Sequence, residues 1–230
     1  MSESENTMIF GKPKYFATDI ETGGIDGKYK FSLLTLYGAV LDSKFNTLSE
    51  IELYMKPNDG APYQIDPSGM AVNKIDLIKH DAMAITMSEA GSRFYNFLKV
   101  NSGDGKNKLT PLGHGISFDV HKINSDLLSR ENFEKFASYR RVCTHSVGAF
   151  LKDAGIIPDT VSGSLISYVQ YFGIPDLGCH AAKNDTLMTI QVYQKFLGLI
   201  IKKDYGNIYV EGLSEIQKEY EKYCAEWSGK

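Results

Sequence analysis

Three strand-like segments follow one another near the start of the chain, at residues 13–20, 31–42 and about 47–56. The second segment is apolar almost throughout, which is typical of a central strand, whereas the third alternates between apolar and polar residues. Because the connections between the segments are short, the pattern predicts an antiparallel meander of three strands.

Alternating helices and strands are predicted for the rest of the chain. Residues 57–70 contain Pro57, Pro62 and Pro67 with several glycines and aspartates, a composition typical of a loop. The predicted helices cover 88–99, 118–128, 145–154, 164–172 and 183–197, and two further short strands are expected near 109 and at 140–143. The pattern therefore predicts an α/β fold with one mixed five-stranded sheet flanked by helices.

Both ends of the chain are expected to lie outside the domain formed by residues 13–198. Residues 1–12 are predicted to be a flexible N-terminal lead, and residues 199–230 a helical C-terminal extension. In this extension Ser214 and Gln217 resemble a capping box. The accompanying apolar stripe consists of Leu213, Ile216, Tyr220 and Tyr223. Such a stripe usually packs on its own domain, so we expect the extension to pack there rather than to bind a partner protein.

The composition is that of a soluble globular protein, with 43% hydrophobic and 23% charged residues in a chain of 230. No apolar run approaches the ~18 residues that a membrane span requires, and the polar, acidic N-terminus is unlike a signal peptide. Three cysteines, an odd number in a chain too large to need disulfides, favour a reducing, cytoplasmic location. The net charge of −3 gives no support for general nucleic-acid binding, so a phosphate-binding site would need metal ions to supply positive charge.

Two carboxylates one residue apart end the first predicted strand, in the run Asp19-Ile20-Glu21-Thr22-Gly23. Side chains at alternate positions of a strand point to the same face, so Asp19 and Glu21 are expected to stand side by side. Two anions so close repel each other, and a cation between them would relieve the repulsion. Taken alone, the pair also fits a strand that ends in solvated acids and a turn.

Two further acidic positions each follow a glycine-containing turn at the start of a predicted helix. Asp119 ends the run Gly-His-Gly-Ile-Ser-Phe-Asp, where the helix dipole favours an acid and Ser117 is a candidate cap. Further along, His180 is expected on a loop and Asp185 in the first helical turn, because this arrangement lets both side chains face one point. Each feature alone also has a purely structural interpretation.

The order and spacing of the three features resemble the DEDDh branch of the DnaQ-like 3′→5′ exonucleases. The matching runs are Asp-Ile-Glu-Thr-Gly-Gly from Asp19, the run that ends at Asp119, and His-Ala-Ala-Lys-Asn-Asp from His180 to Asp185. The resemblance extends from the first predicted strand to the end of the last long helix. One departure is Gly115, where many members carry Asn.

The resemblance implies a ribonuclease H-like exonuclease domain with a two-metal-ion active site. Asp19, Glu21, Asp119 and Asp185 are the implied ligands of two Mg²⁺ or Mn²⁺ ions, and four hard oxygen donors suit these ions. His180 is implied to be the general base. Such an enzyme releases nucleoside monophosphates from the 3′ end of single-stranded DNA or RNA.

Four residues beside the implied metal ligands are candidates for contact with the terminal nucleotide: Ile20, Thr22, Gly23 and Phe118. The first three would use backbone groups and a small apolar wedge, and Phe118 would either stack on a base or belong to the core. The expected partner is a single-stranded DNA or RNA 3′ end. Whether a polymerase or another replication protein is a further partner in trans stays open, and no membrane partner is expected.

Three alternatives to this interpretation stay open. A zinc site from Cys143, His145, Cys179 and His180 would have unusual spacings, because C-x-H and C-H are not the usual ligand pairs. A catalytically idle nuclease-like fold could act as a nucleic-acid or protein adaptor, although all five implied catalytic positions are present. A ribonuclease H-type endonuclease would use similar metal chemistry, but the pair of His180 and Asp185 favours the exonuclease.

Overall fold

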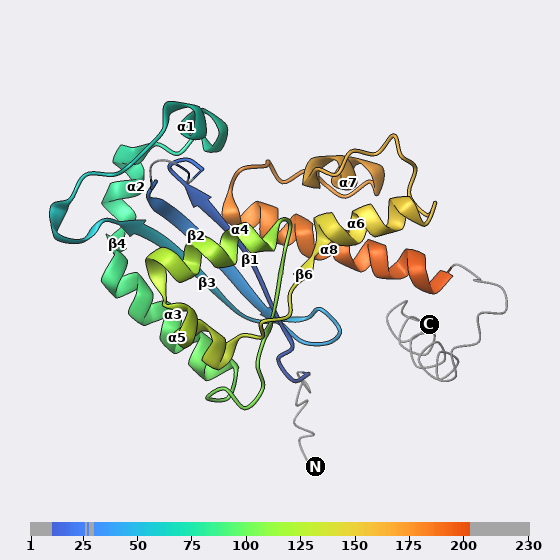
Figure 1. The fold of residues 1–230 in the computed structure, drawn as a ribbon, viewed down its shortest axis with the longest axis horizontal. Coiled ribbons are helices and arrows are strands. Elements are labelled where there is room, and N and C mark those ends of the chain that lie inside the picture. Colours follow the sequence, from blue (N-terminus) through green and yellow to red (C-terminus); the bar gives the residue numbers. More distant parts are fainter. Residues whose placement is uncertain (1–10, 26, 28–29, 203–230) are drawn as a thin grey trace, which may run out of the picture.

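The computed structural model describes residues 11–25, 27 and 30–202, and its centre is one mixed sheet in which these residues form six strands, in the order β4-β3-β2-β1-β5-β6 (Figure 1). The strands are β1 (Tyr15–Thr22), β2 (Leu33–Leu41), β3 (Thr47–Lys56), β4 (Ile85–Thr86), β5 (Thr110–Gly113) and β6 (Val142–Cys143). β1, β2 and β3 pair antiparallel, so the predicted meander is confirmed. β5 pairs parallel to β1, and β6 pairs parallel to β5.

The predicted α/β class and helix-flanked mixed sheet are confirmed, but the sheet has one strand more than expected in the described part of the chain. The additional strand is β4, whose two residues pair parallel to Met55 and Lys56 of β3. Two residues are too few to show the alternation by which a strand is found in a sequence.

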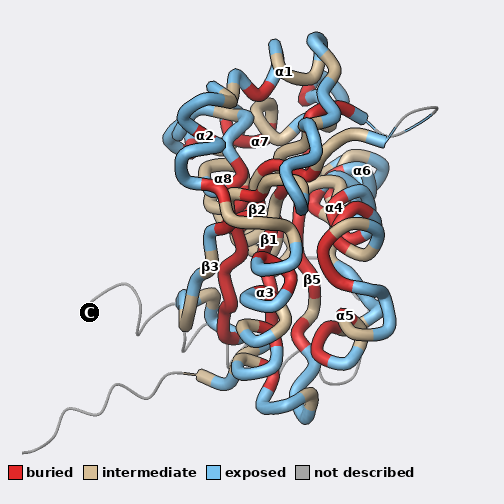
Figure 2. Tube along the Cα trace, turned by 90° about the vertical axis from the view of Figure 1, so that its left-hand side faces the viewer, coloured by how far each residue is buried: buried red, intermediate tan, exposed pale blue. Residues whose placement is uncertain are grey.

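Three helices cover one face of the sheet: α3 (Met87–Asn101), α4 (Ile116–Lys122) and α5 (Arg130–Phe136). Phe16 and Ile20 of β1 point to this face because they alternate with the acidic positions. They belong to a fully apolar core with Phe94 of α3, Val120 of α4 and Phe133 of α5. Figure 2 shows the buried strands running between the two helical layers.

A single long helix, α8 (Ala182–Lys202), covers the opposite face. Tyr15, Ala17 and Tyr37 of the sheet share a core there with Ala182 and Ile190 of α8. The helices α6 (Thr144–Asp153) and α7 (Leu165–Tyr171) pack on the outer side of α8. This second apolar core is formed by Leu151, Tyr168, Met188, Val192, Phe196 and their neighbours. The helix α8 thus holds both layers together.

Several helices differ from their predicted extents. The expected loop at 57–70 contains a single 3-10 turn, η1 (Asn58–Gly60), and the start of α1 (Pro67–Asn73). Asp66 caps α1, since its side chain accepts the Gly69 N–H, and proline suits the first helical position. The helix expected at 118–128 is α4 followed by a π-helical turn, η2 (Ile123–Leu127).

Two helices of seven residues, α2 (Leu77–Met83) and α5, were not predicted as separate elements. The equally short α7 was predicted at 164–172, because Gly173 and Pro175 mark its end. At the other extreme, α8 continues past the predicted domain boundary at 198, and Leu199 packs against the second core. The rest of the predicted C-terminal extension, from 203 onward, and residues 1–10 of the predicted lead lie outside the described residues. None of the described helices is long and apolar enough to span a membrane.

Candidate active site

Asp19 and Glu21 lie at the carboxyl end of β1, half-buried and on the face that α8 covers. One carboxylate oxygen from each, together with one from Asp185, lie within 4.8 Å of one another. The predicted side-by-side placement is therefore confirmed, and a third acid joins the pair. The register of β1 against β2 shifts between Glu21 and Thr22, so regular pairing ends directly after the two acids.

Asp185 lies in the first turn of α8, where its two carboxylate oxygens have different surroundings. Oδ2 accepts the backbone N–H of His180 at 3.0 Å. Oδ1 is buried and has no hydrogen-bond partner among the residues that the structure describes. A buried carboxylate oxygen without a partner is costly unless it binds a cation, so this donor set fits a hard divalent metal ion.

Asp119 approaches β1 from α4, on the other side of the strand. Its side chain is almost completely buried and accepts the backbone N–H of Ile20. The neighbouring strand β5 pairs with β1 only as far as Ala17 and Leu112, so the N–H of Ile20 lies beyond the end of the ladder. Asp119 thus replaces the missing strand partner and is held beside the acids of β1.

The four carboxylates disturb one another's protonation. Burial, together with the negative charges of Asp119, Asp185 and Glu21, raises the pKa of Asp19 well above its usual value. Burial raises the pKa of Glu21 to about 7, with Asp185 and Asp119 adding to the shift. The pKa of Asp119 is raised to about 7, again chiefly by burial, and burial also raises that of Asp185. Such a cluster favours either bound protons or bound cations.

His180 lies on the loop before α8 and its side chain is exposed. The predicted arrangement, with the histidine on a loop and Asp185 in the first helical turn, is confirmed. The backbone of His180 is left-handed, with a φ of 66°, which is unusual for a residue with a Cβ. Asn184 fixes the same loop, because its side-chain amide donates to the carbonyls of Leu177 and Gly178. The role of His180 as general base stays a prediction.

The candidate nucleotide contacts differ in how much of each residue is accessible. The side chain of Ile20 is 6% exposed and packs in the core, so little of it can reach a nucleotide. The N–H of Gly23 donates to Ser32, and the carbonyl of Thr22 accepts from the side chain of Asn73. Contact through these residues stays a prediction.

Phe118 has a different environment from the other candidates, because its side chain is 41% exposed beside the buried Asp119. The alternative that it belongs to the core is therefore wrong, and its ring is available for stacking.

Gly115, the departure from the expected pattern, begins α4 with a φ of 83°. Glycine and asparagine both adopt this left-handed conformation, so the turn is compatible with either residue. The predicted Ser117 cap is wrong, because Gly115 occupies the N-cap position and no side chain caps α4.

Two buried polar residues that support the site were not found from the sequence. Asn73 of α1 donates its side-chain amide to the carbonyl of Thr22 at 2.9 Å. Lys122 is 1% exposed, pairs with Asp126 at 2.9 Å and donates to the carbonyl of Phe31. Phe31 in turn lies against Gly24, where a Cβ would come within 2.9 Å of its ring. One signal could have indicated Lys122, namely its position three residues after Asp119 on the same helical face.

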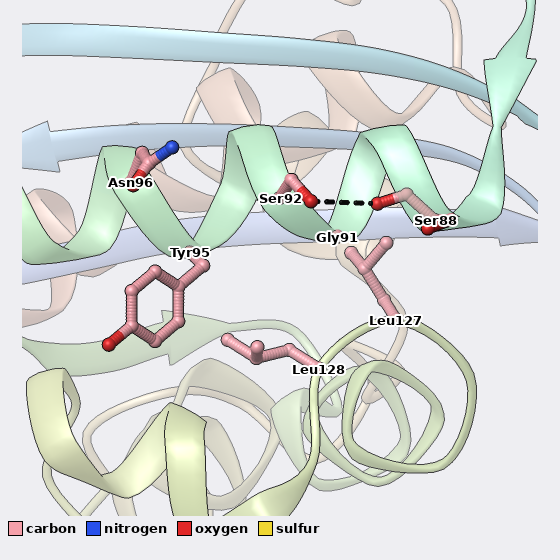
Figure 3. Close-up of a pocket in the computed structure, with 7 residues that line it drawn as sticks. All are labelled: Ser88, Gly91, Ser92, Tyr95, Asn96, Leu127 and Leu128. Carbon is pink, nitrogen blue, oxygen red and sulfur yellow. Dashed lines mark hydrogen bonds between the residues drawn. The ribbon is translucent and has the colours of Figure 1, made fainter.

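No alternative site competes with the acidic cluster in the described part of the chain. The three acids form the one group of potential metal ligands found there, and Cys143, His145, Cys179 and His180 do not form such a group. A pocket of about 460 Å³ lies between α3 and the end of η2 (Figure 3), and none of the four acids lines it. It is lined by Ser88, Gly91, Ser92, Tyr95, Asn96, Leu127 and Leu128.

Comparison with solved structures identifies the fold. A structure of exonuclease I matches with a TM-score of 0.62 and 19% identity, over 81% of this chain and 41% of that chain. E. coli exonuclease I in complex with a dT13 oligonucleotide matches with a TM-score of 0.60 and 16% identity, over 84% and 41% of the two chains. Exonuclease I from Methylocaldum szegediense matches with a TM-score of 0.61 and 18% identity, over 83% and 40%.

The chain therefore has the ribonuclease H-like fold of the exonucleases and spans about two fifths of the length of these neighbours. No family model matches the sequence, and no curated protein is a significant match.

Proposed function

We propose that this protein is a metal-dependent 3′→5′ exonuclease of the DEDDh type. It hydrolyses phosphodiester bonds at the 3′ end of single-stranded DNA or RNA and releases nucleoside monophosphates. The observation that carries the proposal is the convergence of Asp19, Glu21 and Asp185 within 4.8 Å, with one buried oxygen of Asp185 lacking a partner in the described residues. Asp119 adds a fourth carboxylate whose charge Asp19 senses.

The proposed cofactors are two Mg²⁺ or Mn²⁺ ions. Asp19, Glu21 and Asp185 would hold them together with Asp119, since all four offer hard oxygen donors and none requires a soft metal. When bound, such ions supply positive charge for an in-line phosphoryl displacement and acidify water. This charge also explains how a protein with a net charge of −3 could hold a phosphodiester at an acidic site.

The chain's own residues would supply the proton acceptor and part of the substrate contact. His180 is exposed at the edge of the site, and its backbone N–H is held by Asp185, so its ring is free to accept a proton from the attacking water. Phe118 offers an exposed ring one residue from Asp119, where a terminal base would stack.

Single-stranded DNA is the substrate that the comparisons favour, because a neighbouring exonuclease I structure contains a dT13 oligonucleotide. Another neighbour is an ExoI/SSB-Ct complex, which makes a single-strand-binding protein a candidate partner in trans. RNA and a polymerase partner rest on the sequence resemblance alone.

Digestion of matched DNA and RNA oligonucleotides with Mg²⁺ tests the proposal. With a 5′ label and a free 3′ end, a ladder that shortens with time is expected, and a blocked 3′ end should prevent it. Release of the 5′ label as a mononucleotide at the first time point would contradict the polarity. Cleavage of a circular single strand would indicate the endonuclease, and binding without any cleavage would indicate the adaptor.

A further inference from the structure

The end of the sheet opposite the acids is strongly basic. Because β1, β5 and β6 are parallel, all three begin at this end, and β1 carries its acids at the other. The segments that lead into them are 11–14, 106–110 and 138–141, and none contains Asp or Glu. Together they carry Lys12, Lys14, Lys106, Lys108, Arg140 and Arg141, all of which are exposed. We call these six residues the entry patch.

Backbone hydrogen bonds hold the three segments side by side. The N–H of Thr110 donates to the carbonyl of Lys14 at 2.8 Å, and the N–H of Ser138 donates to the carbonyl of Leu109 at 2.7 Å. Neighbouring strands lie ~4.8 Å apart, so the three segments cover a surface roughly 10 Å wide at the level of the backbone. The backbone of the entry patch is therefore continuous, with the Lys14 ammonium over the Tyr15 ring on the α8 face and the Lys108 ammonium at the carbonyl of Glu134 on the α5 face.

The charges of the entry patch are not neutralised by the surrounding described residues. None of its six side chains forms an ion pair there; Lys108 donates instead to the backbone carbonyl of Glu134. The nearby carboxylates already have partners: Glu134 pairs with Arg130 at 2.7 Å and Asp104 with Lys99 at 3.8 Å. Asp42, which lies against Gly11, accepts from the N–H of Lys44 and the side chain of Asn46. In a protein with a net charge of −3, this end presents a positive field to an approaching anion.

An aromatic ring lies within the entry patch. Tyr139 is 69% exposed, and the guanidinium of Arg140 lies over its ring at 5.6 Å from the centroid. Exposed aromatic rings among Lys and Arg side chains are typical of surfaces that bind single-stranded nucleic acids. Tyr139 is the one large apolar residue that the three segments expose, which is too little apolar surface for insertion into a membrane.

We propose that the entry patch binds the phosphate backbone of the same single strand whose 3′ end lies among the acids. This inference rests on the proposed function. The eight residues of β1 separate the two sites by about 26 Å at ~3.3 Å per residue. A single strand stacked as in a duplex advances about 3.4 Å per nucleotide, so a stacked strand needs roughly eight nucleotides to reach the patch. The patch thus gives the enzyme a preference for long substrates without taking part in the chemistry.

The test uses the full chain with Arg140→Gln/Arg141→Gln, and Lys79→Gln/Lys195→Gln as a control that removes the same charge elsewhere. Binding to a fluorescent 20-nucleotide and a 5-nucleotide DNA strand is measured in EDTA over a series of salt concentrations. The patch variant should bind the 20-mer roughly tenfold more weakly, with a salt slope reduced by about 1.4, because two phosphate contacts to a single strand are lost. Its binding to the 5-mer, and the Mg²⁺-dependent hydrolysis of that 5-mer, should match the control.

Equal affinity of the patch and control variants for the 20-mer would overturn the proposal, and so would an equal loss of affinity for the 5-mer. Binding of wild type to anionic phosphatidylserine vesicles, lost in the patch variant while 20-mer binding is kept, would assign the surface to membranes and also overturn it. If wild type binds the 20-mer through the patch but hydrolyses neither strand, the proposed function fails while the patch assignment stands.

Discussion

The backbone N–H of His180 donates a 3.0 Å hydrogen bond to Oδ2 of Asp185, so the proposed general base and a proposed metal ligand are fixed to each other. This bond uses the backbone of His180 and not its ring. The ring is thereby free for proton transfer. The N–H binds Oδ2 of Asp185, and the other carboxylate oxygen, Oδ1, has no partner in the described residues. The ring of His180 on the loop therefore stays available for the proposed proton transfer, and Oδ1 of Asp185 on the helix stays available for the proposed metal ion.

Substitution of His180 separates the role of its ring from the role of its backbone N–H. His180→Ala and His180→Gly both remove the ring but keep the N–H that Asp185 accepts, so hydrolysis should slow by ~10²–10⁴-fold while metal affinity is kept. His180→Gly should also be the more stable of the two, because its φ of 66° costs glycine little. Single-turnover rates and Mn²⁺ affinity measured for both variants provide the check. A near wild-type rate would mean that His180 acts only through its backbone.

Removal of Asp19 should abolish hydrolysis without unfolding the protein. Its pKa is raised by burial and by three neighbouring acids, which shows that the folded state tolerates its negative charge poorly. In EDTA, the melting temperature of Asp19→Ala should therefore equal or exceed that of wild type, while the rate with Mg²⁺ falls by at least ~10²-fold. A large drop in melting temperature would instead indicate a structural role for this acid.

Stability in EDTA should fall as pH rises from about 4 to about 7. The pKa of Glu21 is raised from 4.5 to about 7, and that of Asp119 from 3.8 to about 7, so the folded state holds more protons than the unfolded state in this range. Stability is then fully present below the unfolded values and is lost as pH passes through the folded values. Thermal melts from pH 4 to 8 with EDTA, repeated with Mn²⁺, test this prediction. The decline should be smaller with Mn²⁺, and an equal decline would contradict metal binding by these acids.

Phe118→Ala should impair substrate binding more than folding. The side chain is 41% exposed, so its loss should change the free energy of unfolding by less than ~1 kcal/mol. Loss of one base-stacking contact, worth ~1–3 kcal/mol, should lower kcat/KM by roughly 5–150-fold. Phe150→Ala is the matched control, because Phe150 is 62% exposed on α6. Equal kinetics for the two variants would remove Phe118 from the substrate site.

The sequence was most informative where a feature depends on local periodicity. The first two long strands followed from their apolar runs and the third from its alternation, and Asp19 and Glu21 were placed side by side by strand alternation alone. By contrast, the contact of Asp119 with the N–H of Ile20 depends on where β5 stops pairing with β1, which is a property of the assembled sheet. No local pattern records that position.

Other features were missed because they are too short or depend on burial. The two-residue strand β4 and the seven-residue helix α5 have too few positions to show a period. Ser117 was a reasonable cap by residue type, but the positive φ of Gly115 starts the helix two residues earlier. The exposure of Phe118 could not be distinguished from burial, because a single aromatic residue at a helix start fits both.

Calorimetric titration of Mn²⁺ into the metal-free protein at pH 7.5 tests the central claim most directly, namely that Asp19, Glu21 and Asp185 form a metal centre. Wild type should bind Mn²⁺ with release of protons, since the acids have raised pKa values before the metal enters. Asp185→Asn should bind at least tenfold more weakly, because it keeps the shape of the side chain but loses the charge. Wild-type affinity in Asp185→Asn, or no Mn²⁺ binding by wild type, would contradict the account.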